Sequence, residues 1–434
     1  GTVTDQYGNK TEKQDLSIGN VDVTGPEIYY VQKTPDIANN KETIIFNVTD
    51  KNYDEKNPIT VDEMTIWIDG TQVDSQITKK MTNAVAIKTT IDGKERVVGH
   101  QYTLEIGSIA ETDQEFINSK RTYRELSGTL EIKIKKDAAS DLRGNTLNED
   151  TTTITDTTDV IRPEVKYKYA TSNINKTDKT FTMVFEIVDK YYKGAGTLAV
   201  NNLLIKIDNK EPNWNEVTRS LNVENVSATV NGASKVIGKK YTLKLSNLEQ
   251  LQVKQGDNYL DYSGVITVGI PANIVTDETG NKNIAKTITS GVNIPGGTGA
   301  GQVVDVVAPL IEKESTSANA VNKTATVKFK VTDKYFKASS ITKDNIKVFV
   351  NGTETTSGIT KTLSSTELKE DRVSGSTTTS VQYGVEYTLT VTGYATNANQ
   401  VKIQIPAGLV TDNYDNSNIA TEIILYNVLK PTYT

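Results

Sequence analysis

The sequence predicts an all-β protein built from tandem two-layer β-sandwiches. Three observations carry this prediction. Thr, Asn, Ser and Gly are abundant while hydrophobic residues make up only 36% of the 434 residues, a composition typical of strands and turns. Apolar residues alternate with polar ones at a period of two in several segments. Short sequence anchors recur in the same order three times along the chain, whose length suits about three ordinary domains.

Three anchors define the repeat. The first is an Asp followed four residues later by Pro, at Asp22/Pro26, Asp159/Pro163 and Asp305/Pro309. The second is Asp-Lys-x-aromatic, at Asp50–Tyr53, Asp189–Tyr192 and Asp333–Phe336. The third is Gly-x-x-Tyr-Thr-Leu, starting at Gly99, Gly238 and Gly384. We therefore divide the chain into repeat one (22–158), repeat two (159–302) and repeat three (303–434), with a Gly-rich linker at 295–301 closing repeat two.

A fourth anchor, Asp-x-x-Gly-Asn, closes each repeat. It occurs at Asp141–Asn145 and Asp277–Asn281, and at Asp412–Asn416 with Asp415 in place of Gly. It also occurs at Asp5–Asn9, where no repeat body comes before it. We therefore expect residues 1–21 to be the last strand of a preceding repeat, and the chain to be a window from a longer array.

The alternating segments predict the core strands. Two segments in each repeat place every second residue on an apolar face, which period-two geometry buries on one side of a sheet. They are Ile44/Phe46/Val48, Phe181/Met183/Phe185/Ile187 and Ala325/Val327/Phe329/Val331, then Leu130/Ile132/Ile134, Ile266/Val268/Ile270 and Val401/Ile403/Ile405. A buried sheet face needs a second sheet to cover it, so each repeat is expected to be a sandwich.

In this order the anchors resemble bacterial immunoglobulin-like domains, which occur in tandem in surface proteins and adhesins, particularly of Gram-positive bacteria. The resemblance covers nearly the whole chain. It implies an elongated array of immunoglobulin-like β-sandwich domains at the bacterial cell surface or cell wall. The repeats are longer than the roughly 100 residues of a minimal sandwich, and we place the excess in insertions at 111–127 of repeat one and 248–263 of repeat two.

Composition and motifs exclude several function classes. A net charge of −6 argues against a nucleic-acid binder, and no apolar run is long enough for a membrane helix. The chain has no Cys, which excludes disulfides and thiol chemistry. Its one His, His100, matches Lys239 and Val385 in the other repeats, so we expect a surface strand residue. Nucleophile-elbow, phosphate-loop and dinucleotide motifs are missing, and we predict no enzyme and no required cofactor.

Calcium is the one cofactor for which the anchors supply candidate ligands. Calcium takes six to eight oxygens from carboxylates, amides and carbonyls. We expect each closing turn to approach the opening Asp of the next repeat, giving three groups at the domain junctions: Asp5, Asn9 and Asp22; Asp141, Asn145 and Asp159; Asp277, Asn281 and Asp305. The alternative is an ordinary tight turn in which Asp caps its own backbone.

Two further chemistries start from recurring residues. Lys51, Lys190 and Lys334 recur, as do Asn145, Asn281 and Asn416, and Lys–Asn isopeptide bonds occur in some relatives of the family that the chain resembles. Aromatic side chains outside the apolar faces are candidate ligand contacts. These are Trp67, Trp214 and Phe349, with Tyr123, Tyr259 and Tyr262 in the insertions.

The leading hypothesis is therefore a structural and adhesive extracellular stalk that projects or presents a binding function, with an unidentified protein or glycan as its ligand. Repetition favours it, because a stalk gains length from each copy whereas an active site needs only one. The alternative is an array of carbohydrate-binding modules accessory to a secreted glycoside hydrolase, with the Trp and Tyr residues as sugar platforms.

Overall fold

The computed structural model describes residues 3–11, 21–82, 84–109, 111–117, 120–147, 151–168, 172–195, 198–249, 262–291, 301–319, 321–338, 341–374, 376–395 and 398–426. Strands make up 58% of the structure and helix 3%, which confirms the all-β class. Helical residues include the 3₁₀ turns Val61–Glu63, Lys136–Ala138 and Val200–Asn202. In the described part of the chain, no helix is long and apolar enough to cross a membrane.

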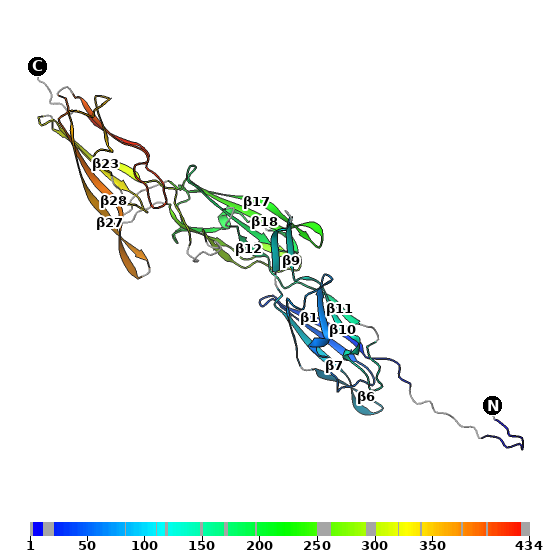
Figure 1. The fold of residues 1–434 in the computed structure, drawn as a ribbon. Helices are drawn as coiled ribbons and strands as arrows, with labels where there is room; N and C mark the ends of the chain where they lie inside the picture. The colour runs from blue at the N-terminus through cyan, green and yellow to red at the C-terminus, as the bar shows by residue number, and fades with distance from the viewer. Residues whose placement is uncertain are drawn as a thin grey trace.

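The chain forms three β bodies that follow one another in a row (Figure 1). Each body has its own apolar core of buried residues, which lie between residues 44 and 161, 165 and 306, and 311 and 425. The core residues come from two sheets in each case, so the sheets are paired in sandwich-like layers.

Repeat one contains two sheets. The first has the strand order β1–β2–β7–β5, with β6 also paired to β7; its strands are β1 (Glu27–Asp36), β2 (Lys41–Thr49), β5 (Thr78–Met81), β6 (Val85–Ile91) and β7 (Lys94–Gly107). The second has the order β11–β10–β3–β4; its strands are β3 (Met64–Ile68), β4 (Thr71–Gln72), β10 (Gly128–Lys135) and β11 (Thr151–Thr158).

Repeat three has the same plan in a simpler form. One sheet runs β23–β24–β28–β27 and the other β26–β25–β29–β30. The strands are β23 (Leu310–Asn319), β24 (Thr324–Thr332), β25 (Lys347–Val350), β26 (Thr353–Glu354), β27 (Thr360–Ser374), β28 (Thr377–Thr392), β29 (Gln400–Ile405) and β30 (Thr421–Tyr426).

Repeat two adds a strand pair that comes from repeat one. Its large sheet has the order β12–β14–β18–β17–β9–β8, with β13 paired to β14; these are β8 (Glu111–Ile117), β9 (Lys120–Glu125), β12 (Glu164–Tyr167), β13 (Asn173–Asn175), β14 (Thr180–Val188), β17 (Thr218–Val230) and β18 (Ala233–Ser246). The β8–β9 hairpin is the predicted insertion of repeat one, and it joins the edge of this sheet through a parallel bridge, Thr229 to Thr122.

The remaining strands of repeat two form the opposite layer. They are β15 (Tyr192–Ala195) paired with β20 (Val275–Asp277), and β16 (Leu204–Ile207), β19 (Gly264–Ile270), β21 (Lys286–Thr289) and β22 (Val303–Val304) around β19. β22 lies beyond the predicted end of repeat two yet pairs with β19 and packs in its core. Val160 and Ile161 likewise pack in the core of repeat one. The connecting residues therefore finish one core before the chain enters the next.

The period-two prediction is confirmed in β2, β10, β19 and β29, where buried residues alternate with more exposed ones, whereas β14 is buried on both faces from Met183 to Val188. Phe329 of β24 and its counterparts Phe46 and Phe185 are fully buried. Each stacks on the Tyr of the third anchor, with ring centroids 5.2, 5.0 and 5.2 Å apart for Phe46–Tyr102, Phe185–Tyr241 and Phe329–Tyr387. The Gly of the same anchor lies against the neighbouring strand: a Cβ on Gly99 would come within 2.2 Å of the Val48 carbonyl oxygen. The anchor therefore conserves a close strand contact and an aromatic pair in the same core.

Candidate cation-binding clusters

Three aspartates from separate segments meet at one end of a repeat, which we call its leading end. They are the opening Asp, the Asp that ends the second core strand and the Asp of the closing turn. One carboxylate oxygen from each lies within 4.8 Å of the others in two groups: Asp22, Asp50 and Asp141; Asp305, Asp333 and Asp412. The second group is almost fully buried, at 2%, 1% and 0% exposure.

The closing turn has one geometry wherever it occurs. The Asp141 carboxylate accepts hydrogen bonds from the backbone amides of Arg143 and Asn145, both at 2.8 Å. Asp5, Asp277 and Asp412 accept the matching pairs of amide bonds at 2.7–2.9 Å. The turn is thus an Asx-type turn of the kind that local sequence predicts. A bridge between Tyr53 and Asp141, and one between Phe336 and Asp412, ties it to the second anchor.

The turns pair with a different opening Asp from the one expected. Asn145 donates to the carbonyl of Asp22 at 3.2 Å, and Asn416 donates to the carbonyl of Asp305 at 3.4 Å. In repeat two, the Thr279 hydroxyl donates to Asp159 at 2.8 Å. Each turn therefore returns to the opening Asp of its own repeat, so the grouping across junctions needs correction. The physical reason is that the closing strands fold back along the sandwich to the end where the repeat starts.

Sequence reasoning missed the middle aspartate. Asp333 follows β24 directly; its amide donates to the Tyr383 carbonyl at 2.9 Å and its carboxylate accepts the Tyr335 amide at 2.7 Å. Asp50 has the same frame, with bonds to Val98 and Asn52. The Asp-Lys-x-aromatic anchor could have identified it, because the anchor places an Asp directly after a core strand in all three repeats.

In the first cluster, the pKa values of Asp50 and Asp22 are shifted in opposite directions. Burial, followed by the negative charges of Asp22 and Asp141, raises the pKa of Asp50 above its usual value, with a backbone hydrogen bond from Asn52 in opposition. Hydrogen bonds from Asn52 and Thr24 lower the pKa of Asp22. Carboxylates held this close repel one another, and a bound cation removes that repulsion.

The donor set of repeat three fits a hard cation. Calcium–oxygen distances are about 2.3–2.6 Å, so two ligands of one ion are at most about 5.2 Å apart. The Asp305, Asp333 and Asp412 oxygens lie within 4.8 Å of one another, which is close enough for all three to reach one ion. The Oδ1 of Asn416 is buried beside them and accepts no hydrogen bond from a described residue. Three carboxylates and this amide oxygen would leave the remaining positions to water.

The remaining predicted metal ligands, in the Asp5–Asn9 turn and in repeat two, are not part of a described three-carboxylate cluster. Asp5 and Asn9 bond to each other, with Asn9 Nδ2 donating to Asp5 at 2.9 Å, and both are exposed. In repeat two the Thr279 hydroxyl links Asp159 and Asp277. Asn281 is turned to the carbonyls of Asp159 and Ile161.

Two of the three recurring lysines, Lys190 and Lys334, contact the preceding repeat. Lys190 Nζ donates to Asp69 Oδ2 at 2.7 Å and to the Ser127 carbonyl of repeat one. Lys334 Nζ donates to Asp208 Oδ2 at 2.8 Å and to the Ser263 carbonyl of repeat two. The Asn residues of the closing turns bond inside their own repeats, so the structure does not bring the Lys and Asn partners of the isopeptide hypothesis together.

The aromatic candidates pack against cations of their own repeats. Lys133 lies 4.0 Å from the ring centre of Trp67, Arg219 lies 3.9 Å from that of Trp214 and Lys402 lies 4.5 Å from that of Phe349. Tyr262 donates to Glu216. The side chain of Tyr123 and all of Tyr259 lie outside the described residues. Trp67, Trp214 and Phe349 therefore each have one ring face covered by a cation of the protein itself.

His100 is not the surface residue that the repeat comparison predicted. It is 9% exposed, and its Nδ1 lies 3.2 Å from the Tyr53 hydroxyl. Tyr53 and Tyr102 both meet the imidazole edge-on. The alternation of β7 points this position into the core; its counterpart Val385 is also buried, whereas Lys239 is half-buried and donates to Asn225.

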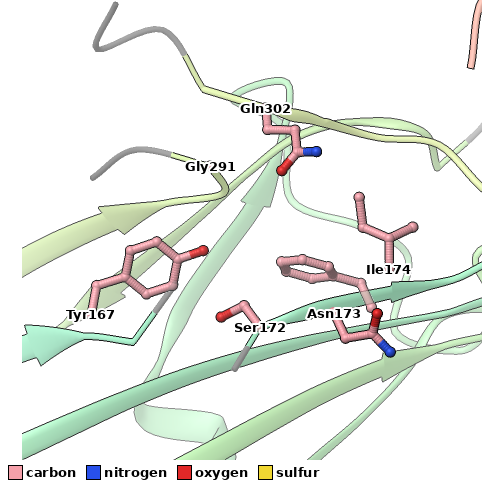
Figure 2. A pocket seen from close by; sticks show the side chains of 7 residues that line it. Tyr167, Ser172, Asn173, Ile174, Gly291 and Gln302 are labelled. Carbon is pink, nitrogen blue, oxygen red and sulfur yellow. The ribbon is translucent and has the colours of Figure 1, made fainter. Parts of the chain in front are cut away.

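A pocket of about 240 Å³ lies beside β13 in repeat two. Figure 2 shows Tyr167 and the side chains of Ser172 and Ile174 around it, with Gln302 on the opposite wall. The lining residues are uncharged. The Ser172 hydroxyl donates a hydrogen bond to the Lys168 carbonyl and accepts one from the Val184 amide.

Comparison with known proteins adds no identity to this geometry. The sequence matches no protein-family model and no curated protein.

Proposed function

We propose that the protein is a structural and adhesive stalk on the outside of a bacterial cell, built of immunoglobulin-like repeats that project or present a binding function. The observation that carries the proposal is the end-to-end order of three similar β bodies, each with its own core (Figure 1). The same lysine contact recurs at both described junctions, and the leading-end cluster recurs in repeats one and three. A chain whose recurring chemistry lies at the body ends suits a spacer, because each added copy increases reach.

We also propose that a hard cation such as calcium binds the leading-end clusters and stiffens the stalk. In repeat three, the ion would join the opening segment at Asp305, the strand end at Asp333 and the turn at Asp412. These segments are far apart in sequence, so an ion held by all three restrains the point where the chain enters the repeat.

Surface labelling of intact cells tests the stalk proposal. An antibody raised against the full chain should stain unpermeabilised cells that produce it, and brief protease treatment of those cells should remove the signal. Staining that requires permeabilisation would contradict an extracellular stalk. A glycan array probed with the same chain addresses the sugar-binding alternative, which predicts binding that is lost in Trp67→Ala or Trp214→Ala.

A further inference from the structure

The two described junctions share one contact. At each, the Lys of the Asp-Lys-x-aromatic anchor reaches back to an Asp and a Ser carbonyl of the repeat before it. The ion pairs are Lys190–Asp69 at 2.7 Å and Lys334–Asp208 at 2.8 Å. Lys190 is 4% exposed, and a lysine that buried is normally found only with a charged partner.

The accepting end has an equally regular construction. We call it the trailing end, opposite the leading end. Asp69 and Asp208 sit in the left-handed region, with φ of 48° and 45°. Each uses Oδ1 to accept a backbone amide, from Thr129 at 2.9 Å and Val265 at 2.8 Å. The other oxygen, Oδ2, receives the lysine.

A glycine makes room for the acidic side chain. A Cβ on Gly128 would come within 2.4 Å of the Asp69 carboxylate, and one on Gly264 within 2.5 Å of the Asp208 carboxylate. The trailing end therefore requires an Asp on a left-handed turn, a Gly opposite it and a buried Ser whose carbonyl faces the junction. Ser127 and Ser263 are 0% and 1% exposed.

Repeat one carries the same lysine at its own leading end. Lys51 is exposed, and it leaves the backbone from the same frame as Lys190 and Lys334. That frame is the preceding Asp, whose carboxylate accepts the amide two residues on at 2.6–2.7 Å in all three repeats.

Repeat three ends differently. Asn351 occupies the left-handed position, with φ of 47°, and its Oδ1 accepts the Asn399 amide at 2.8 Å. Its second side-chain atom is an amide nitrogen, which donates and does not accept from a lysine. Asn399 also stands where the other trailing ends have Gly. The position of the buried Ser is taken by Ala398, so this trailing end lacks the Asp and the Gly and keeps only a backbone carbonyl in place of the third part.

We propose that the leading end of repeat one, through Lys51, is a docking surface for the trailing end of another repeat that carries the Asp, Gly and Ser carbonyl. The partner class is a repeat of this same kind, joined in line. The trailing end of repeat three does not serve as such a partner, because its Asn351 and Asn399 remove the acceptor and the space. This inference extends the stalk proposal, since it states which repeat ends can be neighbours.

The first test uses the single full chain with spin labels. The chain has no Cys, so Thr89→Cys with Lys244→Cys reports the first junction and Lys244→Cys with Ser365→Cys reports the second. Lys190→Gln should broaden only the first distance distribution and Lys334→Gln only the second. Lys51→Gln is the matched control and should change neither. Unbroadened distributions in both junction variants would overturn the role of the lysine.

The second test adds a junction. Two copies are fused so that Asn427 of the first is followed directly by Asp22 of the second. This reproduces the native step from Thr158 to Asp159, because Gln400 pairs with Tyr426 as Thr129 pairs with Thr157. Labels at Ser365 of the first copy and Thr89 of the second are expected to give a broad distribution. Asn351→Asp with Asn399→Gly in the first copy should narrow it, and Lys51→Gln in the second copy should make it broad again.

The outcomes separate the two proposals. A distribution that stays broad after Asn351→Asp with Asn399→Gly, in a fusion whose circular dichroism is unchanged, overturns the docking surface but leaves the surface-labelling result untouched. A distance distribution that stays narrow after Lys51→Gln also overturns the docking surface, because the contact would then not depend on the lysine. If cell-surface staining fails while the distance distribution of the fusion narrows as expected, the extracellular stalk is contradicted and the docking surface at Lys51 is supported.

Discussion

Arg121 of repeat one forms a buried ion pair with Glu186 of repeat two, with Nη1 and Oε2 2.8 Å apart and exposures of 10% and 7%. The arginine lies on β9, in the hairpin that extends the large sheet of repeat two. The first junction therefore combines a strand contact, this ion pair and the Lys190–Asp69 pair. The second junction has the Lys334–Asp208 contact and a hydrogen bond from Lys176 Nζ of repeat two to the Tyr414 carbonyl of repeat three.

Removal of Arg121 should destabilise repeat two. Glu186 would remain buried and would keep the longer ion pair with Lys168, at 3.9 Å. The loss of one partner of a buried pair costs about 3 kcal/mol. Urea unfolding of Arg121→Ala measures the loss. Lys88→Ala is the control, because both members of the Lys88–Glu95 pair are more than half exposed and such a pair contributes about 0.5 kcal/mol. Equal effects of the two substitutions would contradict the buried pair.

The aromatic stack should stabilise each repeat separately. Phe185→Ala removes a fully buried ring that stacks on Tyr241, and such a truncation costs about 3–5 kcal/mol. Hydrogen exchange measured by mass spectrometry should show faster exchange in β14 and β18 and little change in β24 and β28 of repeat three. Faster exchange throughout the chain would mean that the three cores unfold together.

Cation binding at repeat three has a direct optical test. Tyr335 and Tyr414 pack edge-on at the cluster, where burial and then the charges of Asp305 and Asp412 raise the pKa of Tyr414. Terbium bound by these carboxylates should be sensitised by the tyrosines, and calcium should displace it. Asp333→Asn should remove the luminescence of the repeat-three cluster and leave at most that of the Asp22, Asp50 and Asp141 cluster, whereas the exposed control Asp371→Asn should retain the full signal. Equal luminescence in the two variants would place terbium elsewhere.

The first junction should weaken in acid. Partial burial of Asp69 opposes ionisation, but hydrogen bonds from Lys190, Thr129 and Asn231 outweigh it and lower the pKa below its usual value. A carboxyl with a depressed folded-state pKa stabilises fully above the unfolded value of about 3.9 and loses that contribution as pH falls through the folded value. The Thr89–Lys244 label distribution should therefore broaden only below about pH 4. In Asp69→Asn it should be broad at neutral pH and gain no further acid response.

Strand positions were predictable from sequence because burial follows the period of two. Ile403 and Val327 are buried as expected, with their neighbours turned outward. Periodicity does not state which strands become neighbours. The hairpin at 111–125 was therefore predicted as an insertion of repeat one, whereas its strands extend the sheet of repeat two.

The candidate sites were predictable only in part for the same reason. The turn aspartates Asp141 and Asp412 were identified by spacing, but their partners depend on how the closing strands return through space. Comparison of the counterparts predicts a surface residue at His100 because they differ in chemistry, but His100 and Val385 are both buried and only Lys239 reaches an exposed partner. The junction role of Lys190 required the three-dimensional order of two repeats, which no single-repeat motif contains.

The central claim is that the three repeats are joined end to end in an extended array. Small-angle X-ray scattering of the full chain tests it most directly. A single compact body of this length would have a radius of gyration of about 22 Å. We predict a clearly larger value, with a distance distribution that is skewed to long distances as expected for three bodies in a row. A value near that of the compact body, with a symmetric distribution, would contradict the account.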